Sequence, residues 1–154
     1  MRYFLVDKVT AYAPGESASG VKCVTLSDEI LHDHFPDYPI LPGALIVEAL
    51  AQLAGFALEI ESPRPKERAI LAQIEKAKFH APVGPGDQLR LEVKVEQRLE
   101  SAARVRGEAF VGDRAVARAD LTFMLKAIAS ERVHEQRRAL YALWLRELRG
   151  ETSP

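Results

Sequence analysis

The sequence predicts an α+β fold in which an antiparallel sheet wraps around one apolar helix. Residues 42–60 are apolar almost all round, which is typical of a helix that is buried on most sides. Several other segments alternate apolar and polar residues with the period of a strand. The tail returns to a helical period, so we also expect an extra amphipathic helix at the C-terminal end.

The strands are expected to form hairpins, because turn sequences separate them. Strands are predicted over residues 4–13, 21–25, 69–79, 87–100, 102–111 and 114–125. The clearest is LRLEVKVE at 89–96, where four apolar side chains share one face and four charged ones share the other. The turns PGES at 14–17 and VGDR at 111–114 close two of the hairpins.

The central helix is expected to begin at Pro42, a residue that suits the first turn of a helix. Gly43 follows, and its missing side chain would let a ligand approach the backbone. Ser130 could cap the last helix, and Gly150 would end it. We therefore expect one domain over residues 1–126 and a C-terminal helical extension over 127–154.

The composition is that of a globular protein, with 154 residues, 47% hydrophobic and 28% charged. The net charge of −1 gives no general attraction to nucleic acid or anionic lipid. The lone Cys23 rules out a disulfide within the chain and suits a reducing compartment. The longest apolar stretch is interrupted by Glu48, Gln52 and Glu59, which makes it a poor membrane span. No leader is evident at the start, so a cytoplasmic protein is expected.

Glu48 lies inside this apolar helix and has two interpretations. Glu48, Gln52, Gly55 and Glu59 follow one another at spacings of four, three and four, so they share one helix face. That face could be a narrow stripe open to solvent, which is common because carboxylates are seldom buried. Alternatively, a sheet or a second protomer covers it, and a desolvated Glu48 could donate a proton near neutral pH. Periodicity leaves both interpretations open.

His34 also has two interpretations: a structural loop histidine or a catalytic imidazole. The run HDH at 32–34 resembles a set of metal ligands, but no further cysteine or carboxylate cluster completes a site. We therefore expect no metal.

The motif HFPDYPILPGALIVEALAQ, residues 34–52, resembles the signature of the beta-hydroxyacyl-[acyl-carrier-protein] dehydratases of bacterial fatty acid synthesis. As in that family, the glycine follows the histidine by nine residues and the glutamate follows it by fourteen. The resemblance extends to YFLVDKV at 3–9, IEKAKFHAPVGPGDQL at 74–89 and LTFML at 121–125.

The resemblance implies a hotdog fold, in which the sheet wraps the central helix. It implies a homodimer with the two central helices side by side, often assembled further into a trimer of dimers. It also implies the dehydration of a 3-hydroxyacyl thioester to a trans-2-enoyl thioester. The substrate would arrive on the phosphopantetheine arm of acyl carrier protein, so no other cofactor is expected. The face that carries Glu48 would be covered at or near the dimer interface.

The family's functional residues fall on matching positions of this chain. The resemblance assigns His34 as the base, the backbone N–H of Gly43 as the oxyanion donor, and Glu48 of the partner subunit as the acid. The acyl tunnel would be lined by Phe35, Pro42, Gln52 and Phe79, and the His34–Phe35 peptide is expected to be cis. A basic rim for the acidic carrier protein could comprise Arg64, Lys66, Arg68, Lys76 and Lys78, although each could equally be a solvated surface charge.

The chain departs from the family pattern at two places. Asp33 stands where the family has glycine, and its charge would favour the imidazolium form of His34. The tail extends past the usual end of the family and could restrict access to the tunnel. Two alternatives therefore stay open: a non-catalytic acyl-binding or assembly partner, and a hydratase or thioesterase for coenzyme A thioesters.

Overall fold

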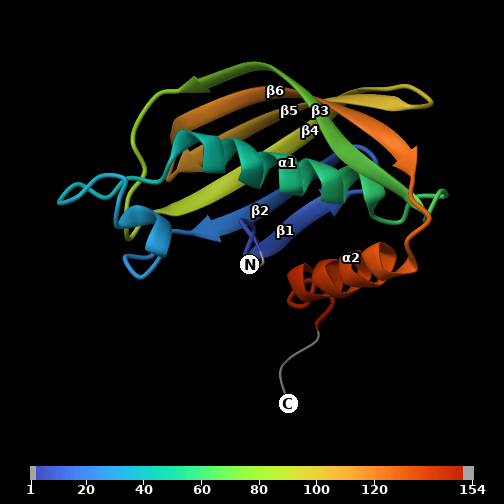
Figure 1. The fold of residues 1–154 in the computed structure, drawn as a ribbon, viewed down its shortest axis with the longest axis horizontal. Coiled ribbons are helices and arrows are strands. Elements are labelled where there is room, and N and C mark those ends of the chain that lie inside the picture. The colour runs from blue at the N-terminus through green and yellow to red at the C-terminus, as the bar shows by residue number, and fades with distance from the viewer. Residues whose placement is uncertain (1–2, 151–154) are drawn as a thin grey trace.

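The computed structural model describes residues 3–150 and has the predicted α+β architecture (Figure 1). The strands are β1 (Lys8–Ala13), β2 (Ser17–Cys23), β3 (Glu67–Phe79), β4 (Gln88–Arg98), β5 (Ala102–Val111) and β6 (Arg114–Ala127). The helices are η1 (Glu29–Leu31), α1 (Gly43–Glu59) and α2 (Glu131–Trp144). The strands form one antiparallel sheet in the order β1-β2-β4-β5-β6-β3.

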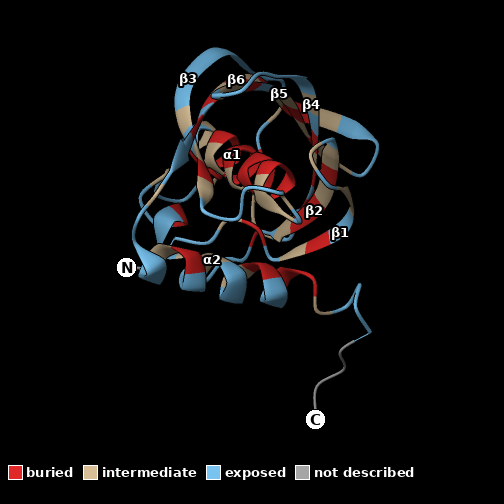
Figure 2. Ribbon diagram, turned by 90° about the vertical axis from the view of Figure 1, so that its right-hand side faces the viewer, coloured by how far each residue is buried: buried red, intermediate tan, exposed pale blue. Residues whose placement is uncertain are grey.

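The sheet curves around α1, whose buried residues form the centre of the core (Figure 2). Leu50, Leu53 and Phe56 of α1 are fully buried against the concave face of the sheet. Alternation along β4 places Leu89, Leu91 and Val93 in the same core, as the sequence predicts. Burial of apolar surface on this scale is what holds the sheet to the helix.

β3 forms one edge of the sheet, because its only strand partner among the described residues is β6. Residues 72–80 are exposed throughout, and the exposed side chains of this strand include Ile70, Ile74 and Phe79. A long exposed edge strand that carries apolar side chains and one unpaired row of backbone groups is a template for pairing with another chain.

α2 lies across α1 on the side that the sheet leaves open (Figure 2). Tyr141 and Trp144 pack on Phe56 of α1, with ring centroids 5.1 and 6.1 Å from that of Phe56. The helix is shorter than the sequence predicts: it ends at Trp144, and turns continue to Gly150. Ser130 precedes it, but its side chain makes no capping hydrogen bond. None of the helices in residues 3–150 is long and apolar enough to cross a membrane.

Candidate active site

The loop before α1 holds His34 in one orientation. The backbone N–H of Ile40 donates to the carbonyl of His34 over 2.8 Å, and Nδ1 of His34 lies 2.9 Å from the carbonyl oxygen of Ile40. A carbonyl oxygen can only accept, so Nδ1 carries the proton of the neutral ring. The lone pair of that ring is then on Nε2, which is the tautomer that a general base needs.

Phe35 lies against this imidazole. The two rings stack with centroids 4.4 Å apart and planes inclined by 23°. The His34–Phe35 peptide is cis, which confirms that expectation. Phe35 is 53% exposed, so a large apolar side chain stands in solvent beside the histidine.

Gly43 is the first residue of α1, and its N–H belongs to the group that finds no acceptor within the helix. A Cβ atom built on Gly43 would lie only 2.7 Å from Cε1 of Phe79. A side chain at residue 43 would therefore push the Phe79 ring away from the start of α1. Phe79 is itself 52% exposed, so it borders solvent as well as Gly43.

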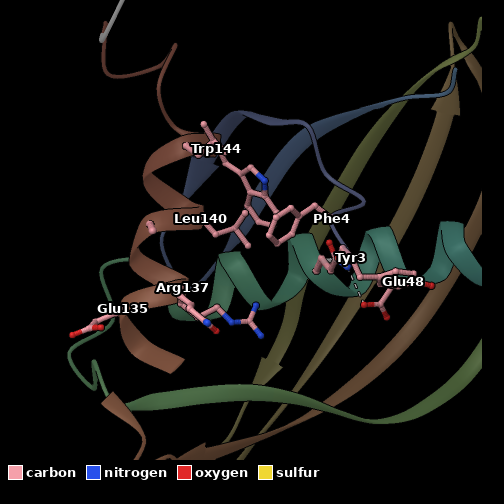
Figure 3. A pocket seen from close by; sticks show the side chains of 11 residues that line it. Tyr3, Phe4, Glu48, Glu135, Arg137, Leu140 and Trp144 are labelled. Carbon is pink, nitrogen blue, oxygen red and sulfur yellow. Dashed lines mark hydrogen bonds between the residues drawn. The ribbon is translucent and has the colours of Figure 1, made fainter. Parts of the chain in front are cut away.

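Glu48 points into a cavity of about 720 Å³ between α1, the segment before β1, and α2 (Figure 3). Gln52, one turn further along α1, donates from Nε2 to Oε1 of Glu48 over 3.0 Å. The same amide group binds the backbone of the segment before β1 at Tyr3 and Leu5. Gln52 therefore fixes the Glu48 carboxyl group and one wall of its cavity together.

His34 and Glu48 lie in separate places within one chain. The side chains that line the Glu48 cavity are Tyr3, Phe4, Glu48, Gln52, Glu135, Gln136, Arg137, Ala139, Leu140, Leu143 and Trp144. Among the described residues that border this cavity, neither His34 nor Phe35 appears. One subunit thus presents an imidazole in the loop before α1 and, in a hollow that His34 does not line, a carboxyl group.

The sequence did not predict that Tyr3, Phe4 and side chains of α2 line this cavity. Of the four predicted tunnel residues, Gln52 lines the cavity, whereas Phe35 and Phe79 border the His34 and Gly43 region. Pro42 is the residue immediately before α1. The one signal for α2 was its apolar stripe, which had to be buried against some partner.

Glu59, on the same helix face, is the deeply buried carboxylate of α1. Tyr141 donates its hydroxyl to both carboxylate oxygens at 3.1 Å, and Nη1 of Arg68 lies 3.3 Å from Oε1. Burial raises the pKa of Glu59 above its ordinary 4.5, against the opposing charges of Arg137 and Arg68 and the hydrogen bond from Tyr141. α2 of the same chain thus covers the end of this helix face that carries Glu59.

The prediction that Arg68 belongs to an exposed basic rim is wrong, because Arg68 is only 8% exposed. Its guanidinium group turns inward to Glu59 and donates to the carbonyls of Pro65 and Glu67. β3 runs back along α1, because Arg68 meets Glu59 and Phe79 meets Gly43. The rim residues therefore separate into two places, with Arg64 and Lys66 near the end of α1, and Lys76 and Lys78 toward its start.

Comparison with known proteins places this chain in a family. The FabA-like domain model matches residues 1–120. The 3-hydroxyacyl-[acyl-carrier-protein] dehydratase FabZ of Koribacter versatilis is 47% identical over 111 residues, which cover 71% of each chain. The enzyme of the same name from Bacillus subtilis is 41% identical over 123 residues, or 80% of this chain and 87% of that one. The chain belongs to the FabA-like family of dehydratases.

Solved structures support the fold of this dehydratase-family chain. A Streptococcus mutans protein, smu.793, determined with bound acetyl CoA, superposes with a TM-score of 0.66. It is 16% identical over 84% of this chain and 96% of its own. The dehydratase heterocomplex ApeI:P of Xenorhabdus doucetiae gives a TM-score of 0.63 at 17% identity, over 80% and 99% of the two chains. At these identities the similarity concerns the hotdog fold alone.

Proposed function

We propose that the protein dehydrates 3-hydroxyacyl-[acyl-carrier-protein] to trans-2-enoyl-[acyl-carrier-protein], as a hydro-lyase of fatty acid biosynthesis. The observation that carries the proposal is the histidine of this family's motif, held with Nδ1 on a carbonyl oxygen in the loop that leads to Gly43, the first residue of α1. The single cysteine agrees with work in the cytoplasm, the compartment in which we place it.

The chemistry follows from these groups. Nε2 of His34 removes a proton from C2, and the charge that develops on the thioester oxygen is held by the N–H of Gly43. The C2–C3 double bond forms as the bond between C3 and the hydroxyl oxygen breaks. Glu48 is assigned as the acid: it gives a proton from Oε2, the oxygen that Gln52 does not bind, to the departing oxygen, and water leaves. Transfer of the proton from the imidazolium to the carboxylate restores the site.

The site is proposed to be composite, with Glu48 supplied by a second subunit. Within one chain, His34 is not among the residues that line the Glu48 cavity, which supports this arrangement. The free edge of β3, with its exposed Ile70 and Ile74, is the surface through which two sheets would join. A homodimer formed in this way would be the unit of activity, and three dimers could assemble into a hexamer.

Acyl carrier protein is the proposed carrier, and its acidic surface would meet two basic groups. Antiparallel pairing of β3 with its copy would bring the Arg64 end of one strand close to the Lys78 end of the other. The two places into which Arg64, Lys66, Lys76 and Lys78 separate within one chain would then lie together across the interface. This dimer therefore rebuilds a basic rim without Arg68.

Complementation between two inactive variants tests the composite site. His34→Ala and Glu48→Gln, each expressed alone, should lose activity by about 100-fold or more, as expected for removal of a general base or acid. Coexpressed, they form mixed dimers in which one site lacks both groups and the other keeps both. Random pairing makes about half of the dimers mixed, so roughly a quarter of the wild-type activity should return.

The assay follows the absorbance of the conjugated enoyl thioester and the release of free thiol. No return of activity in the coexpressed pair would contradict the composite site. Thiol release by the wild type would indicate a thioesterase, and binding of the thioester without turnover would indicate a non-catalytic acyl-binding protein. Crotonyl thioesters of carrier protein and of coenzyme A, compared side by side, identify the carrier.

A further inference from the structure

We propose that α2 forms the far wall of the acyl-binding pocket and thereby limits the length of the acyl chain that this protein accepts. The inference rests on the proposed function, because the pocket concerned is the one into which Glu48 points. It concerns a part of the chain that the family match does not reach: α2 begins at Glu131, whereas the FabA-like match ends at residue 120.

The shape of the cavity supports an acyl chain as its occupant. Its polar end holds Glu48 and Gln52, where the hydroxyl group at C3 of the substrate would lie. From there the cavity passes Tyr3 and Phe4 and reaches the side chains of α2 (Figure 3). Carbon atoms beyond C3 would therefore leave Glu48 directly into this space.

The lining of the cavity offers apolar side chains to a ligand, beside the polar Glu135, Gln136 and Arg137 of α2. Tyr3, Phe4 and Leu143 are large side chains that stay about half exposed around the hollow. Exposed apolar side chains gathered around a cavity mark a binding site more often than an ordinary surface. A volume of about 720 Å³ is within the range of small-molecule pockets and can hold a chain of finite length only.

The wall that α2 contributes is held firmly in place. Tyr141 bonds the buried Glu59, and the ring centroid of Trp144 lies 5.6 Å from that of Tyr141. Trp144 is almost fully buried yet still borders the cavity. A helix fixed by a buried carboxylate and an aromatic cluster cannot move aside at low cost, so the carbon atoms of a longer chain would have to leave the half-open cavity into solvent.

Two alanines of α2 provide a matched pair of variants. Ala139 and Ala142 are both exposed, but Ala139 lines the cavity and Ala142 does not. Ala139→Trp should fill the space without disturbing the core. We expect it to lower kcat/KM for the 3-hydroxyhexadecanoyl thioester by about 10-fold or more, mainly through KM. Its kcat/KM for the 3-hydroxybutyryl thioester should stay within about twofold of wild type, and Ala142→Trp should leave both unchanged.

Trp144 provides a second measurement that needs no turnover, because it is the only tryptophan of the chain. A dodecanoyl pantetheine thioester that is brominated at its distal end should quench Trp144 fluorescence, and the bromobutyryl analogue should not. Ala142→Trp and Ala139→Trp are left out of this measurement, since each adds a second tryptophan. Leu143→Ala, which opens the same wall, should weaken the quenching at a given ligand concentration.

The outcomes separate the two proposals. Length-dependent quenching without any dehydration would support the acyl pocket and overturn the proposed function. Dehydration of all chain lengths with equal response of Ala139→Trp and Ala142→Trp would support the function and overturn the role of α2. A change in oligomeric state on Ala139→Trp, seen by light scattering without a change in chain-length profile, would assign this face to a second copy of the chain and also overturn it.

Discussion

The two ends of α1 use the same helix face in opposite ways. At the first end, Gly43 and Glu48 lie beside exposed aromatic rings and a hollow. At the last end, Glu59 is sealed beneath α2, with a side chain only 3% exposed and bonded to Tyr141 and Arg68. One stripe thus carries a carboxyl group open to a ligand and another that is closed inside the chain.

Glu48 and Glu59 differ in their access to solvent, and this difference matches a difference in the contacts that each carboxylate makes. Burial alone does not mark a catalytic group, because Glu59 is the carboxylate whose pKa burial raises, and its partners are all structural. Glu48 keeps one oxygen free of protein partners among the described residues and faces a cavity. The accessible carboxylate suits chemistry, and the sealed one suits the attachment of α2.

Arg68→Met should produce the largest effect on the sealed end. It removes the ion-pair partner of the buried Glu59 and leaves the charge of Arg137, so the free energy of unfolding at pH 7 should fall by up to about 3–5 kcal/mol. The loss should shrink in acid, where protonation of Glu59 removes the unpaired charge. Urea unfolding at several pH values measures both effects.

Arg64→Met is the control for this variant, since Arg64 pairs with Glu67 at the surface with its side chain 57% exposed. Removal of the exposed Arg64 leaves Glu67 paired with Arg98, so a loss below about 1 kcal/mol is expected. Equal losses of unfolding free energy in the two variants would show that the buried pair of Arg68 and Glu59 stabilises the fold no more than the pair of Arg64 and Glu67 does.

Tyr141→Phe should have the next largest effect. It removes the single hydroxyl proton that is shared between both oxygens of a buried carboxylate, for which a loss of about 1–3 kcal/mol is expected. Tyr38→Phe, at an exposed tyrosine, should change the free energy of unfolding little. If the aromatic contacts of residue 141 alone held α2, Tyr141→Phe would match this control.

Glu59→Gln should change the pH dependence of stability. Burial raises the pKa of Glu59 in the folded state above its ordinary 4.5, so the folded chain binds this proton more tightly than the unfolded chain does. The stabilisation that results is fully present below pH 4.5 and is lost as the pH rises through the folded pKa. Relative to Glu59→Gln, the wild type should therefore lose stability over that interval, no faster than about 1.4 kcal/mol per pH unit. A flat difference would contradict the raised pKa.

The elements of the sheet could be predicted because each depends on local alternation, and β4 is the clearest case. The motif from His34 to Glu48 could also be found, because its spacing lies within one loop and one helix. The contact between Glu59 and Tyr141 could not, since it joins residues 82 apart and has no periodicity. Arg68 was misjudged for the same reason: a charged loop sequence gave no sign that its guanidinium group turns inward.

Gly43→Ala tests the open end and should have the smallest effect on stability. The new Cβ would meet the Phe79 ring at 2.7 Å, but that side chain is half exposed and can move aside. We therefore expect a loss below about 1 kcal/mol, since relaxed overpacking at a surface costs less than in a core. Dehydration should suffer more than stability, because the new methyl group and the displaced ring would crowd the helix start whose N–H would hold the thioester oxygen.

Gly55→Ala is the matched control on the same helix, because no described residue lies within 4 Å of a Cβ built there. Alanine favours a helix interior over glycine, so this change should be neutral or stabilising by up to about 1 kcal/mol. In the double variant Gly43→Ala/Phe79→Ala, the ring is gone and the cost of the first change should disappear, which a double-mutant cycle measures. If Gly43→Ala still lowers the free energy of unfolding when Phe79 is alanine, the glycine is required by the backbone conformation of residue 43 and not by contact with the Phe79 ring.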